Sequence, residues 1–401
     1  MSVKYICEGV SEVGAAHPDL EMFDSLMPTP FGTTYNSYLV RGADKIALID
    51  SVDDRKLSVF LENLRAAKVE RIDYIISLHA EQDHSGTLRD LLEYWPMARL
   101  VALPKTAEML SIHLHLPVEE MKVMQANEVL DLGGKTLKFI PIPFAHWPDN
   151  TMLWLAEDRI LFSSDLFGSH YAKETPGLEP GSELIRAARD YYAEIMMPFR
   201  AQCSRYTRLA RELDPRLIAA SHGPVWSDPR VILDQYERWT NDEVRPLVTI
   251  AWVTMHDSTK RMVEHLARSL AEHGIAVASH NVGTYPDALT RGTGHLMSDL
   301  VDATALVIAT PTVLAGPHPA AAYAALLANA LRPKIKIFST LNSYGWGGKP
   351  EETLELLTGQ LKVKRLPGVK VKGLPTEEDY RAIEDFAAVL ASEVRAVAAS
   401  D

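Results

Sequence analysis

A short segment that follows a predicted strand combines two imidazoles with two carboxylates. The strand is the apolar stretch DYIISL at residues 73–78, and the segment after it contains His79, Glu81, Asp83 and His84. Side chains alternate sides along an extended chain, so we expect the first three of these to point one way and the fourth to point across. Imidazole nitrogens and carboxylate oxygens in this pattern can bind two metal ions side by side.

Three more potential ligands follow predicted strands. They are His146 after residues 136–144, Asp165 after residues 159–164 and His222 after residues 216–221. A ligand at the carboxyl end of each of several strands is a common way for a rigid sheet to hold a metal site. Four histidines and three carboxylates suffice for a binuclear centre in which one carboxylate bridges. The alternative for residues 83–85 is the start of a helix, with Ser85 as its N-cap.

The pattern H-x-[HE]-x-D-H, followed by separate His, Asp and His residues, resembles the metallo-β-lactamase superfamily. Its hydrolases usually have histidine at the third position and bind zinc, whereas this chain has Glu81 there. The carboxylates then carry a charge of −3, and two ferrous ions with one bridging hydroxide balance that charge. Anionic oxygen ligands favour a metal that cycles through a trivalent state, so we expect di-iron rather than di-zinc. The chain has only two cysteines, which excludes a Cys-ligated zinc site and a Cys-ligated iron–sulfur cluster.

The elements that must position these residues are mainly strands. Residues 1–246 contain strand-like segments at 36–42, 45–51, 73–78, 99–103, 136–144, 152–157, 159–164 and 216–221, and helical segments at 55–67 and 86–95. Many strands with amphipathic helices between some of them predict two sheets with helices packed outside.

The rest of the chain, residues 247–401, alternates strands and helices. Strands are expected at 247–254, 275–282, 304–311 and 334–340, and helices at 260–273, 319–331 and 376–399. This alternation predicts a parallel, doubly wound sheet. The net charge of the chain is −12, and 15 Lys and Arg against 16 Asp and Glu after residue 247 leave most of that charge in the first part. We therefore expect two domains, 1–246 and 247–401.

Three loops of the second domain follow predicted strands at the edge of the sheet where ligands bind. The first loop leads directly into a predicted helix. The N–H groups at the N-terminus of that helix and the hydroxyls of the loop can bind a phosphate. The loops comprise Thr254, Met255, His256, Asp257, Ser258 and Thr259; Pro311, Thr312, Val313, Leu314, Ala315 and Gly316; and Ser343, Tyr344, Gly345, Trp346 and Gly347. The aromatic residues of the third loop can flank a flavin ring. The chain has no G-x-G-x-x-G and no P-loop motif, which disfavours a dinucleotide site and an NTPase.

Composition fits a globular protein, with 401 residues, 47% of them hydrophobic and 23% charged. The acidic balance argues against nucleic acid or an anionic membrane as a partner. The chain shows no export signal and no apolar membrane span, so we expect a cytoplasmic protein.

Taken together, the chain resembles the flavodiiron proteins, also called A-type flavoproteins. The matching features are H-x-E-x-D-H, the separate His, Asp and His, Y-Y-A-x-I at 191–195 and S-Y-G-W-G-G at 343–348. The resemblance implies a metallo-β-lactamase-like αββα sandwich (α+β) followed by a flavodoxin-like α/β domain that binds FMN. The loop 254–259 departs from the family, because His256-Asp257 replaces a pair such as Tyr-Gly; the Asp257 side chain should point away from a phosphate. Asn342 likewise stands where Gly is usual.

The resemblance also implies how the ligands are shared. His79, Glu81 and His146 would bind one iron, Asp83, His84 and His222 the other, and Asp165 would bridge; family members differ in whether the residue at the His84 position turns toward iron. FMN would pass electrons to the two irons, which reduce O2 to water, NO to N2O, or both. The expected partners are a rubredoxin-like donor and a second copy of the chain in a head-to-tail homodimer or a dimer of dimers.

Some questions stay open at this level. A di-zinc hydrolase with an appended flavodoxin domain is the alternative function, and a non-catalytic electron carrier is another. The sequence does not choose between O2 and NO. Tyr191, Tyr192 and His170 are candidates for a proton or hydrogen-bond donor to the substrate. The basic stretch 362–372 is a candidate docking site for an acidic donor, or an ordinary solvated strand and loop.

Overall fold

The computed structural model describes residues 3–173, 178, 179, 181–283 and 293–399. By their internal contacts these residues form two compact units. The first unit comprises 1–23, 29–192 and 199–240, and the second comprises 24–28, 193–198 and 241–401. The main division falls between Thr240 and Asn241. The domain limits 1–246 and 247–401 stay a prediction.

Two sheets form the centre of the first unit. The strand order of the first sheet is β1-β2-β7-β8-β9-β10-β11, and that of the second is β12-β13-β14-β15-β16. In chain order the strands are β1 Lys4–Cys7, β2 Val10–Glu12, β7 Tyr38–Arg41, β8 Ile46–Ile49, β9 Tyr74–Ile76, β10 Arg99–Ala102, β11 Lys122–Val123, β12 Val129–Asp131, β13 Thr136–Pro141, β14 Thr151–Leu155, β15 Ile160–Ser164 and β16 Leu217–Ala220. Short strands at β3 Ala15–His17, β4 Met22–Phe23, β5 Met27–Pro28 and β6 Thr33–Tyr35 lie outside these two sheets.

The core of the first unit lies between its two sheets. Ile49 and Ile76 of the first sheet belong to the same buried cluster as Phe139 and Phe162 of the second. The strand expected over 136–144 is too long, because β13 ends at Pro141. Prolines at 141 and 143 lack the N–H that a longer ladder would need.

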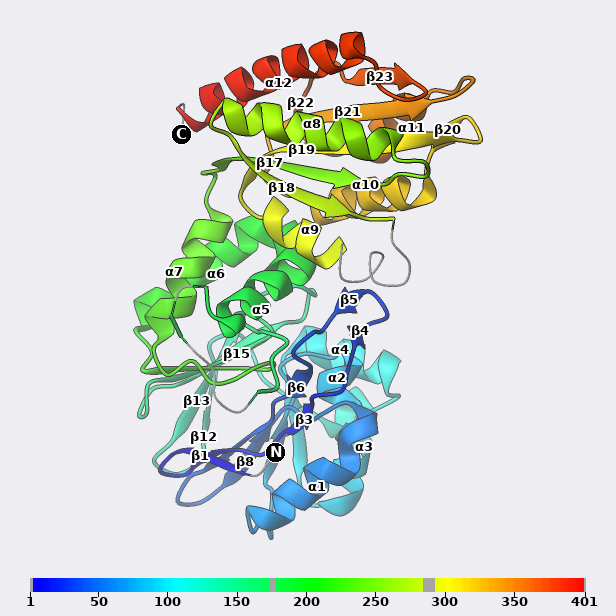
Figure 1. Cartoon of the computed structure of the whole chain (residues 1–401). Coiled ribbons are helices and arrows are strands. Elements are labelled where there is room, and N and C mark those ends of the chain that lie inside the picture. Colours follow the sequence, from blue (N-terminus) through cyan, green and yellow to red (C-terminus); the bar gives the residue numbers. More distant parts are fainter. Residues whose placement is uncertain (1–2, 174–177, 180, 284–292, 400–401) are drawn as a thin grey trace. The chain divides into compact units, whose positions relative to one another are not determined.

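Helices accompany the strands of the first unit. They are α1 Leu57–Ala66, α2 Gln82–Ser85, α3 Leu88–Tyr94, α4 Pro104–His113, α5 Glu183–Tyr191, α6 Arg200–Leu213 and α7 Pro229–Thr240. A π-helix at Tyr192–Met196 begins at the last residue of the segment 29–192 and continues into residues 193–198 of the second unit. The helices expected at 55–67 and 86–95 are present as α1 and α3, and α4 to α7 were not predicted. Helix α6 contacts α7 (Figure 1).

The second unit contains a sheet in the order β18-β17-β19-β21-β22, with β23 also paired to β21. Its strands are β17 Arg245–Trp252, β18 Ala276–Asn281, β19 Ala303–Val313, β20 Gly316–Pro317, β21 Ile337–Tyr344, β22 Lys364–Arg365 and β23 Val369–Lys372. All the pairings along that order are parallel, and only β20 pairs antiparallel, with β19. This is the 2-1-3-4-5 order of a flavodoxin-like sheet.

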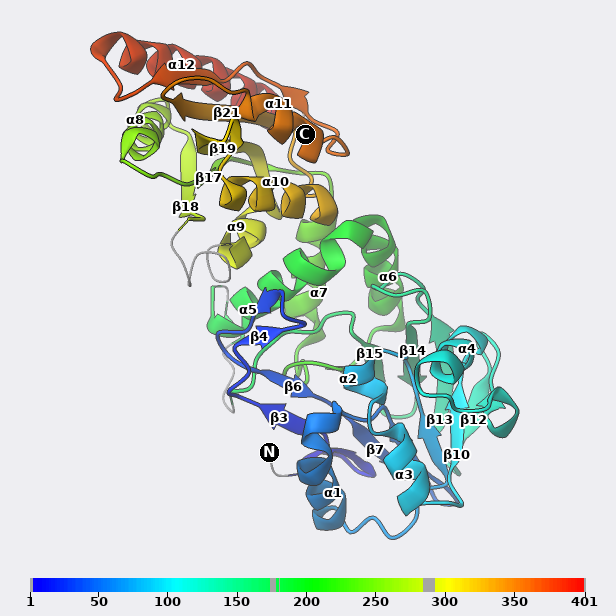
Figure 2. The same cartoon turned by 90° about the vertical axis from the view of Figure 1, so that its right-hand side faces the viewer.

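Helices cover both faces of this sheet (Figures 1 and 2). They are α8 Ser258–Glu272, α9 Thr293–Leu300, α10 Pro319–Leu331, α11 Pro350–Leu357 and α12 Glu377–Ala398. Helices α8 and α12 lie side by side on one face and share a buried cluster with β17, β19 and β21. Helices α9 and α10 contact the sheet from the other side. The doubly wound parallel sheet predicted from the sequence is therefore confirmed.

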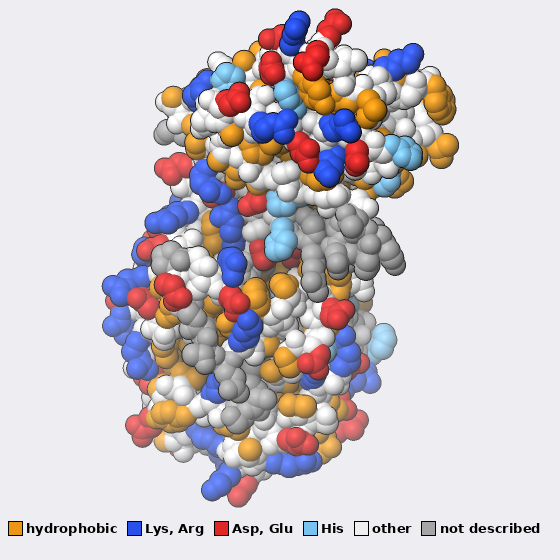
Figure 3. All heavy atoms as spheres, in the orientation of Figure 1, with side chains coloured by type: hydrophobic (Ala, Val, Ile, Leu, Met, Phe, Trp, Pro, Cys, Tyr) orange, Lys and Arg blue, Asp and Glu red, His pale blue; other side chains and the backbone are white. Residues whose placement is uncertain are grey.

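The surface carries both kinds of charge. On the face shown in Figure 3, Lys and Arg side chains are interspersed with Asp and Glu side chains. Within the described ranges, no helix has both the length and the apolar character needed to cross a membrane.

Candidate functional site

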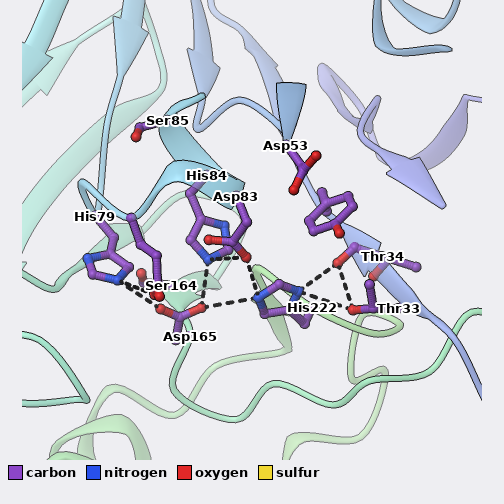
Figure 4. Close-up of polar contacts among 12 residues, drawn as sticks. Thr33, Thr34, Asp53, His79, Asp83, His84, Ser85, Ser164, Asp165 and His222 are labelled. Carbon is purple, nitrogen blue, oxygen red and sulfur yellow. Dashed lines mark hydrogen bonds and ion pairs between the residues drawn. The ribbon is translucent and has the colours of Figure 1, made fainter. Parts of the chain in front are cut away.

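The seven predicted metal ligands come together in the first unit as two adjacent groups. The first group is His79, Glu81, His146 and Asp165, and the second is Asp83, His84 and His222. Within each group the ligand atoms lie within 4.8 Å of one another. Figure 4 shows His79, His84 and His222 converging on Asp165 from three different elements.

Three of these side chains follow the ends of strands. His79 follows β9, Asp165 follows β15 directly and His222 lies two residues after β16. Because β15 and β16 run parallel, their carboxyl ends meet at one edge of the second sheet. His146 instead lies in a loop, five residues after the end of β13.

The expectation that Asp83 points the same way as His79 and Glu81 is wrong. The chain is extended only up to Glu81 and becomes helical at Gln82, so alternation does not apply to Asp83. The Ser85 hydroxyl donates to the Ala80 carbonyl at 2.8 Å and closes this turn. Asp83 therefore joins His84 and His222, the grouping that the family resemblance implied.

Asp165 is the carboxylate that lies between the groups. Its Oδ2 is 3.4 Å from Nε2 of His79 and 3.4 Å from Nε2 of His146. Its Oδ1 is 2.9 Å from Nε2 of His84 and 3.5 Å from Nε2 of His222. One oxygen thus faces each group, as a bridging ligand requires.

The remaining distances complete the two groups. Oε2 of Glu81 is 3.0 Å from Nε2 of His79 and 3.2 Å from Nε2 of His146. Oδ2 of Asp83 is 3.3 Å from Nε2 of His84 and 3.2 Å from Nε2 of His222. His84 is therefore turned toward the carboxylates rather than away from them.

Several of these buried atoms have no hydrogen bond that satisfies them. Among the described residues, both carboxylate oxygens of Asp83, both of Asp165 and both ring nitrogens of His84 lack a hydrogen-bond partner. Asp165 and His84 are almost completely buried. Buried polar atoms without partners are costly, and a cation shared by these oxygens and nitrogens removes that cost. The donor set therefore fits metal ions.

The close packing of acids and bases shifts their pKa values. Burial by itself would lower the pKa of His84, but the charges of Asp83 and Asp165 outweigh it and raise that pKa to about 10. Burial opposes the same change at His146, where the nearby carboxylates of Asp165 and Glu81 raise the pKa to about 9. Burial would raise the pKa of Asp165, yet the surrounding imidazoles, His84 foremost, hold it well below its usual range.

Two of the predicted ligands, His79 and His222, each make a hydrogen bond through Nδ1, the ring nitrogen that faces away from the other ligands. These bonds fix the orientation of the two rings. Nδ1 of His79 donates to Oδ1 of Asp149 at 3.0 Å, and Nδ1 of His222 donates to the carbonyl of Thr34 at 2.6 Å. Sequence reasoning missed both partners. Asp149 lies in the loop that also carries His146, seventy residues after its partner His79.

The three candidate proton or hydrogen-bond donors occupy different surroundings. The Tyr192 hydroxyl donates to the Trp239 carbonyl at 3.1 Å. The Tyr191 hydroxyl and Nε2 of His170 are buried, with no hydrogen-bond partner in the part of the chain that is described. The ring of His170 packs edge-on against Tyr191 and against His222, with centroids 5.0 and 5.2 Å apart. Tyr191 also lies against His222, so it borders the second group.

The predicted phosphate and flavin loops line one cavity of about 180 Å³ in the second unit. Ten of the predicted residues line it: Thr254, Met255, His256, Ser258, Thr259, Pro311, Thr312, Ser343, Tyr344 and Gly345. Gly373 also lines it and was not predicted. The other seven, outside the lining, are Asp257, Val313, Leu314, Ala315, Gly316, Trp346 and Gly347. Leu314 and Trp346 are 90% and 83% exposed.

The cavity fits a phosphate-bearing ligand. Oγ1 of Thr254 and Oγ1 of Thr312 are buried and have no partner among the described residues. The cavity lies at the N-terminus of the 15-residue helix α8, whose free N–H groups favour an anion. Asp257 has a φ of 62° in the left-handed region that usually favours glycine, and it makes no cap hydrogen bond, while both of its neighbours line the cavity.

Comparisons with known proteins agree with this arrangement. Residues 33–223 match the model of the ODP family beta lactamase. An anaerobic nitric oxide reductase flavorubredoxin of Escherichia coli O1:K1 / APEC is 32% identical over 356 residues, which are 86% of this chain and 73% of that protein.

Two solved structures extend the likeness to the whole chain. The rubredoxin oxygen:oxidoreductase from Desulfovibrio gigas superposes with a TM-score of 0.90 at 28% identity and covers 98% of this chain and 99% of its own. The flavodiiron protein from Giardia intestinalis also gives a TM-score of 0.90, at 25% identity, over 100% of this chain and 98% of its own. With the two-sheet unit, the flavodoxin-like unit and the convergent imidazoles and carboxylates, these matches show that the chain belongs to the flavodiiron protein family.

Proposed function

We propose that this protein is a flavodiiron reductase that takes electrons from FMN to a non-haem di-iron centre and reduces O2 to water, NO to N2O, or both. The observation that carries the proposal is Asp165, whose two oxygens face two separate groups of ligand atoms. The relatives support an oxidoreductase, since one is named a nitric oxide reductase and another an oxygen oxidoreductase.

The geometry and the family resemblance both support the proposed assignment of ligands. His79, Glu81 and His146 would hold one iron, Asp83, His84 and His222 the other, and Asp165 would bridge. FMN would lie in the cavity formed by the three loops, with its phosphate at the start of α8. When bound, these groups supply reversible electron transfer and open coordination positions for a diatomic substrate.

The residues of the chain itself supply protons and orientation. Reduction of O2 to two waters takes up four protons, and reduction of two NO to N2O and water takes up two. The Tyr191 hydroxyl is buried beside His222 and has no hydrogen-bond partner among the described residues, so it can donate to a substrate atom. Burial and the charge of His222 lower the pKa of His170 far below its usual value, which keeps the ring neutral. Its Nδ1 lies 2.8 Å from the Thr33 hydroxyl, which fixes the ring beside Tyr191.

The alternative functions are less well supported. A di-zinc hydrolase would be expected to have histidine in place of Glu81, and the relatives are oxidoreductases. A non-catalytic electron carrier would use only the flavodoxin-like unit. Convergence of all seven ligand residues in the other unit argues against that function.

Partners are proposed from the family. A rubredoxin-like donor would deliver electrons to the flavin, and a head-to-tail homodimer would bring the flavin of one chain to the irons of the other.

The basic stretch 362–372 has fewer unpaired positive charges than its sequence suggested. Lys364 pairs with Glu393 at 2.6 Å and Lys370 pairs with Glu351. Lys362 and Lys372 are the exposed lysines for which we predict donor contacts.

The proposal is tested with purified protein. Iron and FMN are measured on one sample, which is then reduced anaerobically and divided between an O2 electrode and an NO electrode. We expect two irons and one FMN per chain, with consumption of at least one gas. Two zinc ions with no gas consumption would support the hydrolase instead.

Replacing Tyr191 with phenylalanine is expected to lower the turnover of O2 or NO by about 10-fold or more, since a positioned proton donor contributes about 10²-fold or more. Tyr192→Phe is the matched control. It loses the bond to the Trp239 carbonyl, which costs about 1 kcal/mol of stability, and keeps its turnover. Steady-state gas consumption, together with thermal melts, measures both effects. Equal turnover in Tyr191→Phe and wild type would remove Tyr191 from the mechanism.

Removing the metal is expected to make thermal stability fall as pH rises. In the metal-free protein the pKa values of His146 and His84 are about 9 and 10, above the ordinary 6.5. Their stabilisation is complete below pH 6.5 and is lost as pH rises through 9 to 10. We expect the melting temperature to fall by about 5 °C or more between pH 6.5 and 9.5.

Ferrous iron should change this dependence, because iron binds only the neutral imidazoles and its affinity rises with pH. The difference in melting temperature between iron-loaded and metal-free protein should therefore widen from pH 6.5 to 8.5. Melting curves recorded anaerobically at each pH measure it. A metal-free protein whose stability is constant or rises over this range would contradict the prediction that His84 and His146 are protonated in the absence of metal.

A further inference from the structure

Asp149 lies behind His79 and is held from three directions. The residue is 3% exposed, and its Oδ2 accepts the N–H of Ala80 at 2.8 Å while its Oδ1 faces Nδ1 of His79 at 3.0 Å. Its carbonyl accepts the hydroxyl of Thr106, in α4, at 3.0 Å. The carboxylate therefore joins the chain at 79–80 to a loop seventy residues further on.

Three carboxylates fix the direction of the His79 ring: Asp149 lies on the Nδ1 side, and Glu81 and Asp165 lie on the Nε2 side. A carboxylate at Nδ1 requires that nitrogen to carry a hydrogen. In the neutral ring, the form that binds a metal, the lone pair is then on Nε2 and points between Oε2 of Glu81 and Oδ2 of Asp165. A cation at that point would satisfy all three atoms.

Asn150, the residue after Asp149, supports the segment that carries Asp165. Oδ1 of Asn150 accepts the hydroxyl of Ser164 at 2.7 Å, and Ser164 is the residue before Asp165. Ser164 has a φ of 53°, in the left-handed region that is unfavourable for a non-glycine residue. Figure 4 labels Ser164 next to Asp165, which it precedes in the chain. Two neighbouring side chains of one loop thus brace the segments that carry His79 and Asp165.

We infer that Asp149 is a positioning residue for the first metal position, fixing the tautomer and direction of His79, and that Asn150 supports the turn that presents Asp165. The inference rests on the proposed function. It also makes a distinction between the metal positions: Asp149 contacts a ligand of the group His79, Glu81 and His146, whereas His222 has its own partner in the Thr34 carbonyl. Loss of the carboxylate should weaken one metal position and spare the other.

The test is the substitution Asp149→Asn, which keeps the size of the side chain. Its amide oxygen can still accept from Ala80, but the amide N–H₂ then faces Nδ1 of His79. That nitrogen becomes the acceptor, so the hydrogen moves to Nε2 and blocks the metal-binding lone pair. Loss of a partner behind a metal ligand costs about 10–100-fold in metal affinity. We expect ferrous iron to leave one position about 10–100-fold faster than in wild type, while the other position keeps the wild-type rate.

The measurement follows release of ferrous iron to a colorimetric chelator, with a Mössbauer spectrum of the ⁵⁷Fe-loaded protein. We expect biphasic release and a change in only one quadrupole doublet. Asp73→Asn is the matched control, because Asp73 lies before the same strand β9 and its Oδ2 accepts the Ile46 N–H at 2.8 Å. It should release both irons at the wild-type rate. Thr106→Val, which removes only the bond to the Asp149 carbonyl, should give a smaller acceleration at the same position.

The outcomes separate the inference from the function. If Asp149→Asn holds both irons as tightly as wild type, or loses both equally while its fold is intact, the inference is wrong and the proposed function stands. If Asp149→Asn does not fold, the same comparison is made with Thr106→Val, and an unchanged release rate there overturns the inference. A wild-type protein that binds no iron overturns the proposed function and the inference together.

Discussion

Replacing Asp165 with asparagine is expected to leave at most one iron per chain and to lower O2 and NO consumption by more than 100-fold. The reason is geometric. Asp165 alone among the described ligand residues has one oxygen directed to each group, at 3.4 Å from Nε2 of His79 and 2.9 Å from Nε2 of His84. Loss of a residue that only supports a ligand costs about 10–100-fold in affinity or activity, so loss of the bridge should exceed that.

The asparagine side chain fails as a bridge for two reasons. Its amide nitrogen is a hydrogen-bond donor and does not bind a cation, so only one of the two groups keeps its oxygen. The substitution also removes one of three negative charges that balance the two metal ions. In the metal-free protein the same change removes one of the acids that, against burial, raise the pKa of His84 (with Asp83) and of His146 (with Glu81), so these imidazoles become neutral at lower pH.

Iron content by elemental analysis and gas consumption on the same sample measure the effect. Asp131→Asn is a suitable control, because Asp131 is an exposed carboxylate at the end of β12 that accepts the N–H of Gly133 at 2.8 Å. It should keep two irons and full turnover. An Asp165→Asn protein with two irons and more than a tenth of wild-type turnover would show that Asp165 does not bridge.

The difference between what the sequence predicted and what it missed has a physical basis. Local pattern located the strands that end at the site, because buried strands such as β15 require an apolar run, here Ile160, Leu161 and Phe162. Helix α6 lacks a comparable signal. Its buried residues are Cys203, Tyr206, Thr207 and Ala210, which are small or carry a polar atom and so mark an apolar face only weakly.

At the site too, residue types could be predicted from the sequence, but some side-chain directions and partners could not. The seven residues that converge at the site could be predicted, because residue type restricts which side chains can bind a metal. The direction of Asp83 could not, because the change from extended chain to helix after Glu81 depends on contacts made by Ser85 and by the carbonyl of His84, which accepts the N–H of Ser51 at 2.8 Å. Asp149 could not be predicted either, since its partner His79 lies seventy residues earlier and only the fold brings the two together.

Replacing Glu81 with histidine is expected to exchange iron for zinc and to lower O2 and NO consumption by more than 100-fold. The substitution creates H-x-H-x-D-H, the pattern of the zinc hydrolases that this part of the chain resembles. Glu81 lies in the group that holds His79 and His146, with its Oε2 at 3.0 and 3.2 Å from their Nε2 atoms. A third imidazole there changes the total charge of the ligands from −3 to −2 and replaces a hard oxygen ligand with a softer nitrogen ligand.

The expected direction follows from the general order of metal affinities. Zinc binds most nitrogen and oxygen sites more tightly than ferrous iron, so a protein obtains iron by the number and charge of its carboxylates and by metal availability. Glu81 reduces the advantage of zinc at the first position. Zinc has no accessible second oxidation state, so a zinc-loaded site passes no electrons to O2 or NO.

The experiment loads wild type, Glu81→His and Glu81→Asp with equal ferrous iron and zinc under anaerobic conditions and measures the bound metals. Glu81→Asp keeps the charge of −3 while shortening the side chain. If charge decides the metal, Glu81→Asp retains iron and Glu81→His takes zinc. If the length of the side chain decides which metal binds, Glu81→Asp loses iron as well. A Glu81→His protein that retains two irons and reduces O2 or NO at more than a tenth of the wild-type rate would show that metal choice is set elsewhere, and the argument from ligand charge would then fail.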